Sequence, residues 1–177
     1  MMRAATLAAA LCLAMSSTFA AAGSLDSRRA TSADAPLAYL LFCLEHNTQC
    51  ATGKVGRVQH SNKLRQTLER VNRSVNSSIR FKADRRESWS SNVSRGDCED
   101  FALTKRKMLV RAGVPAGALR LATVRTRRGE GHAVLVVMTS AGELVLDNAR
   151  TTIVDRRQTN YRWLSMASKD PRRWTDL

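Results

Sequence analysis

The sequence lacks any apolar segment long enough to cross a bilayer, and its longest apolar run lies near the start. Within its 177 residues, the apolar run Ala4 to Met15 follows Arg3 and precedes small residues, where Ala20 and Ala22 suit an A-x-A cleavage site. The run is too short to cross a bilayer and is typical of a secretory signal peptide. We therefore expect residues 1–22 to be a signal peptide, no transmembrane segment after its cleavage, and a periplasmic or secreted protein.

Acidic residues are also scarce. Only 15 stand against 29 lysines and arginines, which gives a formal charge of +14. In a cytosolic protein such a charge would indicate nucleic acid as the partner. Here the basic residues are dispersed in short groups such as Arg85-Arg86, and no basic tract is interleaved with stacking aromatics. We expect a solvated basic surface and no nucleic-acid site; for an exported protein, anionic envelope material or an acidic partner is the alternative.

The chain has few cysteines, four in all. Cys12 belongs to the signal peptide, whereas Cys43 and Cys50 lie close together in "CLEHNTQC", so a local disulfide is expected in an oxidising compartment. Metal binding through Cys43, His46 and Cys50 is the alternative, although three ligands at this spacing are foreign to common zinc modules. Cys98 is left unpaired, and an unpaired thiol in an exported protein calls for an explanation.

The chain after the signal peptide divides into two predicted parts. Small polar residues at 23–35 predict a flexible lead-in, and residues 36–177 are enough for one domain with a real core. Helices come first and strands follow, which predicts an α+β fold with N-terminal helices packed on an antiparallel sheet. Apolar spacing and turn residues place the helices at 36–46, 61–79 and 97–112, and the strands at 118–126, 131–139 and 142–149.

Cys98 stands at the start of the third predicted helix, in "GDCEDF". Asp97 is a good N-cap residue, and acids at a helix start complement the helix dipole. The segment alone fits a small buried cysteine as well as a catalytic nucleophile. In the second case, free N–H groups at the helix start would stabilise the oxyanion of the reaction intermediate. Negative neighbours disfavour a thiolate. A hard cation such as Ca²⁺, bound through Asp97, Glu99 and Asp100, would offset their charge.

Histidine is rarer still, with three residues, and His132 begins the strand "GHAVLVVMT". If the hairpin turns tightly at "TSAG", His132 lies opposite Ala149, and Asp147 lies two residues away on the same face. That diagonal is roughly 7–8 Å between Cα atoms, within reach of an imidazole and a carboxylate. Taken singly, His132 is better explained as a strand-end histidine and Asp147 as a turn residue. With Cys98 they supply the attacking thiol, the base and the orienting acid of nucleophilic catalysis.

Four segments together resemble the bacterial transglutaminase-like cysteine peptidases, a papain-like family with a transglutaminase core. They are "DCEDFALTKRKMLVRAGVP", "GEGHAVLVV", "ELVLDNAR" and the Trp-bearing tail. Weaker similarity extends back through "VNRSVNSSI" and the Cys43/Cys50 pair. The resemblance implies a papain-like, transglutaminase-core fold with the catalytic cysteine at a helix N-terminus. It also implies Cys98, His132 and Asp147 as the triad.

More distantly, the chain resembles the LapG-type periplasmic proteases. These clip surface adhesins after binding calcium and are sequestered by a membrane receptor for a cyclic dinucleotide. Asp97, Glu99 and Asp100 match their calcium-binding acids, whereas the segment after Trp89 is shorter than theirs. Trp89 is expected either to line the oxyanion hole or simply to pack at the helix start. Asn148, beside the proposed acid, is either a site-supporting amide or a turn residue.

These observations predict an exported cysteine peptidase that forms an acyl-enzyme with a protein or peptide substrate in the cell envelope. A transglutaminase or amidase with the same triad is the nearest alternative. A non-catalytic module that binds an envelope component is the alternative from a different functional class. Calcium and a membrane regulatory receptor are the further expected partners.

Overall fold

The computed structural model describes residues 32–177. The predicted signal peptide and residues 23–31 of the predicted lead-in lie outside the described residues. The described part begins with the two-residue strand β1 (Ser32–Ala33), which pairs with the C-terminal strand β9 (Trp174–Asp176). Ordered structure is therefore present before residue 36, where the domain was predicted to start.

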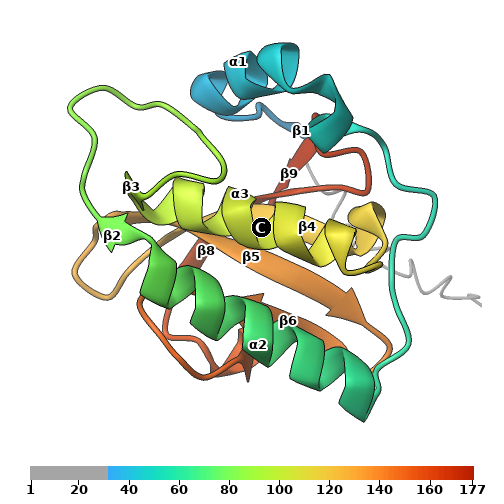
Figure 1. Cartoon of the computed structure of the whole chain (residues 1–177). Coiled ribbons are helices and arrows are strands. Elements are labelled where there is room, and N and C mark those ends of the chain that lie inside the picture. Colours follow the sequence, from blue (N-terminus) through green and yellow to red (C-terminus); the bar gives the residue numbers. More distant parts are fainter. Residues whose placement is uncertain (1–31) are drawn as a thin grey trace, which may run out of the picture.

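Three α-helices appear where apolar spacing predicts them. α1 (Leu37–Glu45) follows Pro36, and α2 (Asn62–Ser78) begins after Ser61, whose hydroxyl accepts a hydrogen bond of 3.1 Å from the N–H of Leu64. α3 (Cys98–Arg111) ends just before Gly113, whose φ of 87° is costly for residues with a side chain. In Figure 1, α2 and α3 lie side by side across one face of the sheet, and α1 lies above them.

The main sheet has seven strands in the order β1-β9-β8-β4-β5-β6-β7, all paired antiparallel. A separate parallel pair joins the ends of the loop that precedes α3. This arrangement confirms the predicted α+β class. The remaining strands are β2 (Arg80–Phe81), β3 (Arg95–Gly96), β4 (Leu119–Arg125), β5 (Gly131–Thr139), β6 (Gly142–Leu146), β7 (Val154–Asp155) and β8 (Arg162–Ala167).

The β5–β6 hairpin has the predicted register. Thr139 lies opposite Gly142 and Leu135 opposite Leu146, so the same register continued to the start of β5 places His132 opposite Ala149. The C-terminal segment adds strands that were not among the three predicted ones. β8 pairs with β4, which extends the sheet beyond the three predicted strands.

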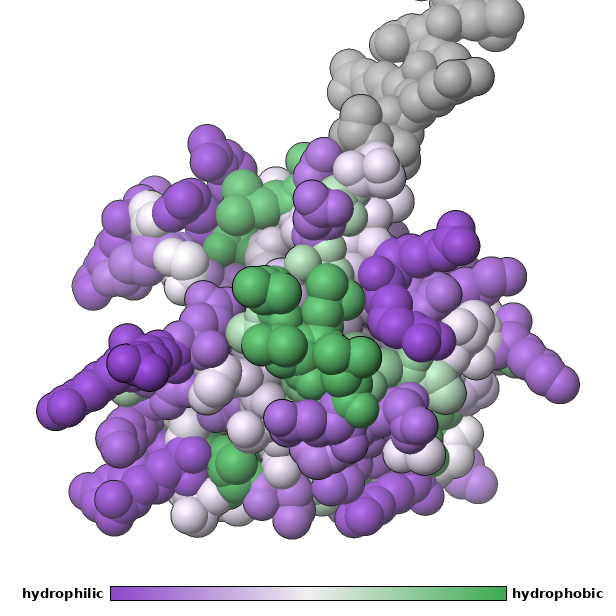
Figure 2. Space-filling model, turned by 90° about the horizontal axis from the view of Figure 1, so that it is seen from above, coloured by the Kyte–Doolittle hydropathy of each residue, from purple (hydrophilic) through white to green (hydrophobic). Residues whose placement is uncertain are grey.

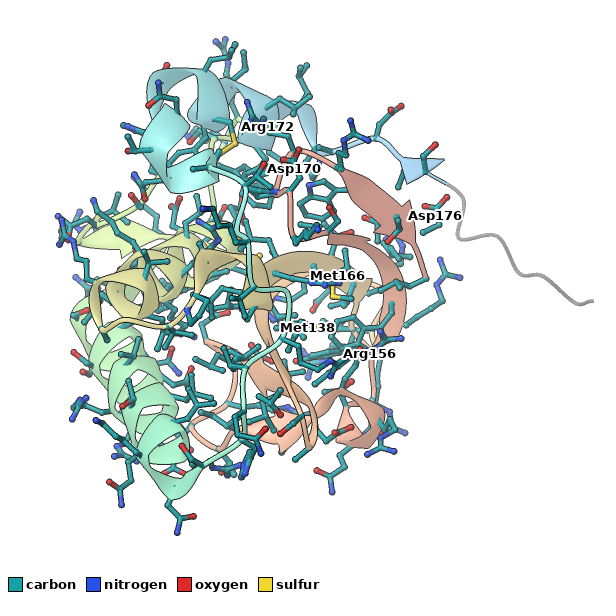
Figure 3. All side chains as sticks on the ribbon, turned by 90° about the vertical axis from the view of Figure 1, so that its right-hand side faces the viewer. Met138, Arg156, Met166, Asp170, Arg172 and Asp176 are labelled. Carbon is teal, nitrogen blue, oxygen red and sulfur yellow. A yellow bond between two sulfur atoms is a disulfide. The ribbon has the colours of Figure 1, made fainter. Side chains whose placement is uncertain are left out.

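β5 is buried on both faces of the sheet, as its continuous apolar run predicts. Leu135 and Val137 face α2 and α3 as part of one core cluster. On the opposite face, Met138 and Met166 of β8 belong to a second cluster, against which Trp163 packs. Figure 3 shows these two methionines near each other, with Arg156 beside them. The Arg156 guanidinium lies 4.9 Å from the Trp163 ring and helps to cover this face.

α1 buries only one side. Tyr39, Phe42 and Cys43 face the core, and Cys43 forms the predicted disulfide with Cys50 in the 3₁₀ helix η1 (Asn47–Cys50). The opposite side carries three leucines that are 72%, 53% and 79% exposed: Leu37, Leu41 and Leu44. Figure 2 shows an apolar patch on the face seen from above, surrounded by hydrophilic residues. None of the helices within residues 32–177 has the length and apolarity needed to cross a bilayer.

Candidate active site

Cys98 lies where the first turn of α3 meets the start of β5. The N–H of Ala133 lies 3.3 Å from the Cys98 Sγ and donates a hydrogen bond to it. The helix therefore begins directly beside the strand that carries His132, even though the two segments are far apart in the sequence. The thiol is half-buried and is the one free cysteine among the described residues.

His132 and Asp147 meet across the β5–β6 hairpin. His132 Nε2 lies 2.9 Å from Asp147 Oδ1, and the two side chains are 10% and 1% exposed. This contact leaves Nδ1 as the ring nitrogen that Asp147 does not occupy. Burial acts to raise the pKa of Asp147, but hydrogen bonds from His132, Tyr161 and the Ala149 N–H outweigh it and hold that pKa below its usual range. The carboxylate is therefore charged and is able to orient the imidazole.

Tyr161 is a member of this network that the sequence analysis missed. Its hydroxyl donates to Asp147 Oδ2 at 2.6 Å, and its ring stands edge-on to the His132 ring with centroids 5.6 Å apart. Burial, with help from Asp147, raises the pKa of Tyr161 to about 12, so the hydroxyl keeps its proton. Tyr161 comes from the segment just before β8, and only the pairing of β8 with β4 brings it here. No local sequence signal marks it.

Two asparagines of α2 hold the loop that carries Asp147. Asn76 Nδ2 donates to the carbonyl oxygens of Asp147 and Arg150 at 2.9 and 3.1 Å. Asn72 Nδ2 donates to those of Arg150 and Thr151, both at 3.2 Å. These bonds satisfy backbone acceptors that no strand partner reaches. The sequence does contain a signal for them, because two amides spaced four apart interrupt the apolar side of α2.

The environment of the acidic residues around Cys98 disfavours their charged forms, in contrast to that of Asp147. The Cys98 thiol donates to Glu99 Oε2 at 3.1 Å. Burial raises the pKa of Cys98 well above its usual range, and Glu99 raises it further. Burial, and after it the neighbouring Asp97 carboxyl, raises the pKa of Glu99 to about 8, and burial raises that of Asp100 to about 6. Cys98 is therefore a neutral thiol in this environment.

The three predicted metal ligands do not converge on one point. Asp100 Oδ1 accepts from the Ser90 N–H at 2.7 Å, and Asp97 Oδ2 accepts from the Asp84 N–H at 3.3 Å. Within residues 32–177, no group of three or more His, Cys, Asp or Glu side chains is placed to hold a metal ion. Asp97 does occupy the N-cap position, but its side chain makes no capping bond, which corrects that expectation. Its Oδ1 is buried and lacks a hydrogen-bond partner among the described residues.

Trp89 and Asn148 were the predicted supporting residues. Trp89 is buried, its ring lies 5.0 Å from the Tyr39 ring of α1, and its N–H donates to Glu87 Oε1 at 3.3 Å. These are packing contacts, and a role of Trp89 in the oxyanion hole stays a prediction. Asn148 follows Asp147 in a bend, and its buried Oδ1 has no hydrogen-bond partner within the described chain.

Lys105 lies on the same face of α3 as Cys98, two turns further along. It is fully buried, with Nζ 5.9 Å from the centre of the Phe101 ring. Burial lowers the pKa of Lys105 to about 7, although the negative charge of Asp147 acts in the opposite direction. A buried amine that gains and loses its proton near neutral pH therefore lies behind the candidate site.

Comparisons with known proteins place the chain in a family and give its fold relatives. A family model described as bacterial transglutaminase-like cysteine proteinase matches residues 29–177. Calcium-bound LapG of Legionella pneumophila is similar in structure, with a TM-score of 0.54, 26% identity, and coverage of 58% of this chain and 64% of LapG. EGTA-treated LapG of the same organism gives the same TM-score, identity and coverage of this chain, and 62% of its own length is covered. The chain thus spans less than two thirds of these LapG chains. No curated protein sequence shows a significant match.

Proposed function

The chain belongs to the bacterial transglutaminase-like cysteine proteinases, and on this premise we propose that it is an exported peptidase with Cys98, His132 and Asp147 as its triad. Its substrate is a protein or peptide of the cell envelope. The observation that carries the proposal is the position of a helix-start thiol, bonded to the N–H of Ala133, next to the residue His132, whose imidazole forms a 2.9 Å bond with Asp147.

The proposed reaction has two halves. His132 takes the proton of Cys98 on Nδ1, and Sγ attacks the carbonyl carbon of the scissile bond to form a tetrahedral intermediate. The carbon–nitrogen bond then breaks as the imidazolium returns the proton to the leaving amine, which leaves a thioester on Cys98. His132 next takes a proton from water, and hydroxide adds to the thioester. The carbon–sulfur bond then breaks to release the carboxylic acid product, and the imidazolium returns the proton to Sγ. Asp147 orients the imidazole throughout, and backbone N–H groups at the start of α3 would hold the oxyanion.

We also propose calcium as the ion that completes the acidic side of the site. Asp97 and Glu99 would hold it, with Asp100 adjoining. The donor set suits a hard cation, because all the donors are carboxylate oxygens and Asp97 Oδ1 is buried without a partner among the described residues. A bound cation would supply positive charge beside the nucleophile. The calcium-bound LapG structure supports this assignment. A regulatory membrane receptor stays a prediction from the family resemblance.

The triad is tested with a peptide-like electrophilic probe that labels active thiols, followed by mapping of new N-termini in envelope protein extracts. We expect wild-type protein to be labelled at Cys98 and to generate new N-termini. Cys98→Ser and His132→Ala should abolish both while the fold, followed by circular dichroism, is kept. His60→Ala is the matched control and should retain both. Undiminished cleavage in His132→Ala would overturn the triad.

The same assay separates the alternatives. A labelled primary amine added to the reaction becomes incorporated into substrate only if the enzyme transfers acyl groups to amines. Incorporation in place of new N-termini would replace hydrolysis with transglutamination. No probe labelling of the wild type at neutral pH, with or without added calcium, would instead favour the non-catalytic binding module.

A further inference from the structure

A cavity of about 230 Å³ lies between η1 and the outer side of α3, away from Cys98. Lys107, Val110 and Arg111 face it because they lie on the side of the helix opposite to Cys98. Thr48 and Arg106 also line it. Three positively charged side chains thus line the cavity, those of Arg106, Lys107 and Arg111, and no acidic residue does.

The charge of Arg106 is buried without a carboxylate partner. The residue is 4% exposed; Nη1 donates to the carbonyl oxygen of Gln49 and Nε to that of Leu119, the latter at 3.2 Å. Burial lowers the pKa of Arg106, and the one titratable group that opposes this effect is Tyr39. Burial raises the pKa of Tyr39 to about 12, so Tyr39 is neutral at physiological pH. Buried charges in proteins are usually paired, and this guanidinium has only dipolar partners.

The other cations of the cavity are equally unpaired. Among residues 32–177, neither Lys107 nor Arg111 forms a hydrogen bond or an ion pair through its side chain. A second cavity at the β5–β6 turn provides the contrast, because two of its three arginines are matched by acids. There Arg156 pairs with Glu143 at 3.0 Å, and a neighbouring arginine pairs with an aspartate at 2.9 Å. Positive charge at the α3 cavity therefore exceeds what the described chain neutralises.

We propose that the cavity between η1 and α3 binds a phosphate group. Its volume lies below the range of about 300–1,000 Å³ that is typical of drug-sized ligands, so it suits a small anion or one head group. Arg106 and Arg111 would donate to the phosphate oxygens, for which the planar guanidinium is well shaped. Lys107 adds a point charge, and the Thr48 hydroxyl adds a donor. Val110 would contact whatever apolar group the phosphate carries.

Such binding would also fasten η1 to α3. Gln49 already connects η1 to the loop before Cys98, since its Oε1 accepts from the Ser91 hydroxyl at 3.1 Å. Arg106 already joins α3 to η1 through the Gln49 carbonyl, and a phosphate that contacts Thr48 and α3 together would add a second connection between these two elements. The ligand should therefore raise the melting temperature in addition to binding, because it has no comparable site on the unfolded chain.

The test is a titration of the purified protein with inorganic phosphate, against sodium chloride of matched ionic strength. The main variant is Lys107→Glu/Arg111→Glu, which changes two side chains on the helix surface and leaves buried Arg106 in place. It should bind phosphate roughly tenfold more weakly or worse. Arg127→Glu/Arg128→Glu, in the exposed β4–β5 turn, makes the same charge change and should bind within roughly twofold of wild type. Equal loss in both variants would mean general charge attraction and would overturn the site.

Vesicles identify the source of the phosphate. Co-sedimentation with phosphatidylglycerol vesicles but not with phosphatidylcholine vesicles, lost in Lys107→Glu/Arg111→Glu and kept in the control variant, would assign a lipid head group. Phosphate binding in solution without vesicle binding would assign a soluble phosphate compound. If wild type binds neither phosphate nor anionic vesicles more tightly than Lys107→Glu/Arg111→Glu does, the proposal is wrong.

Discussion

The candidate site has a sheet side, with His132 and Asp147, and a helix side, with Cys98 and its acidic neighbours. The two sides differ in how well the protein stabilises the charged form of their carboxyl groups. On the sheet side, Asp147 accepts hydrogen bonds from His132, Tyr161 and Ala149, and its pKa is lowered. On the helix side, the carboxyl groups around Cys98 are buried and the pKa values of Glu99 and Asp100 are raised. His132 and Asp147 are thus already arranged as the proposed triad requires. Cys98, the proposed nucleophile, lies among acids that the described chain does not neutralise.

The largest effect is expected from breaking the satisfied side. Asp147→Asn keeps the size of the side chain but removes the charge that orients His132 and stabilises its protonated form. We expect the rate of peptide cleavage to fall by about 10³–10⁴-fold, as the loss of a triad acid does elsewhere. The measurement is kcat/KM with a cleaved peptide, with Asp34→Asn at an exposed position as the control. A loss of less than about tenfold would mean that Asp147 does not orient a catalytic base.

The second effect concerns the unsatisfied side. Removal of calcium with EGTA should lower the activity strongly, and saturating calcium should raise the melting temperature by roughly 5–10 °C over the chelated form. Asp97→Asn should abolish that rise, whereas Asp34→Asn should retain it. Calorimetry and terbium luminescence give readouts that do not depend on turnover. Identical activity and melting temperature with and without chelator would remove calcium from the proposal and leave the triad in place.

A smaller effect is expected from Tyr161→Phe, which deletes one hydrogen bond from the satisfied side. The rate should fall by roughly 3–30-fold, the range expected for a hydrogen bond to a charged group. Since this bond lowers the pKa of Asp147, its loss should raise that pKa and move the low-pH limb of the rate profile to higher pH. Tyr39→Phe, in the core beside α1, should change stability without moving that limb. An unshifted limb in Tyr161→Phe would contradict a positioning role.

The smallest effect concerns stability and the buried amine between the two sides. The pKa of Lys105 is about 7 in the folded protein, so between pH 7 and its ordinary value, about 10.4, the unfolded chain binds more protons. This residue should therefore make the protein more stable as the pH rises through that window. Urea unfolding of Lys105→Met should show a flatter dependence on pH than wild type or the exposed control Lys82→Met. Parallel curves would contradict the burial of a neutral amine.

The sequence predicted the parts of the site that depend on local rules. Helical spacing placed Cys98 at the start of α3, and a tight turn fixed the register that carries His132 towards Asp147. These features need only periodicity and hairpin geometry. The roles of the three residues in catalysis stay a prediction.

The remaining features depend on contacts between distant segments. Tyr161 reaches Asp147 only because β8 crosses over to pair with β4, and no neighbouring residue signals that pairing. Asp97 was expected to cap α3, yet its side chain bonds to the N–H of Asp84 from the β2–β3 loop. Local propensity identified the N-cap position correctly, and tertiary contacts decided what the side chain does there.

The disulfide between Cys43 and Cys50 has a consequence for the order of events after synthesis. It closes a loop in which the Gln49 carbonyl accepts from Arg106 and the Gln49 side chain accepts from Ser91. A newly made chain in a reducing cytosol would lack this link, since disulfides persist mainly in oxidising compartments. For the exported peptidase proposed above, oxidation after export would then tighten the segment before Cys98, so that maturation would follow delivery.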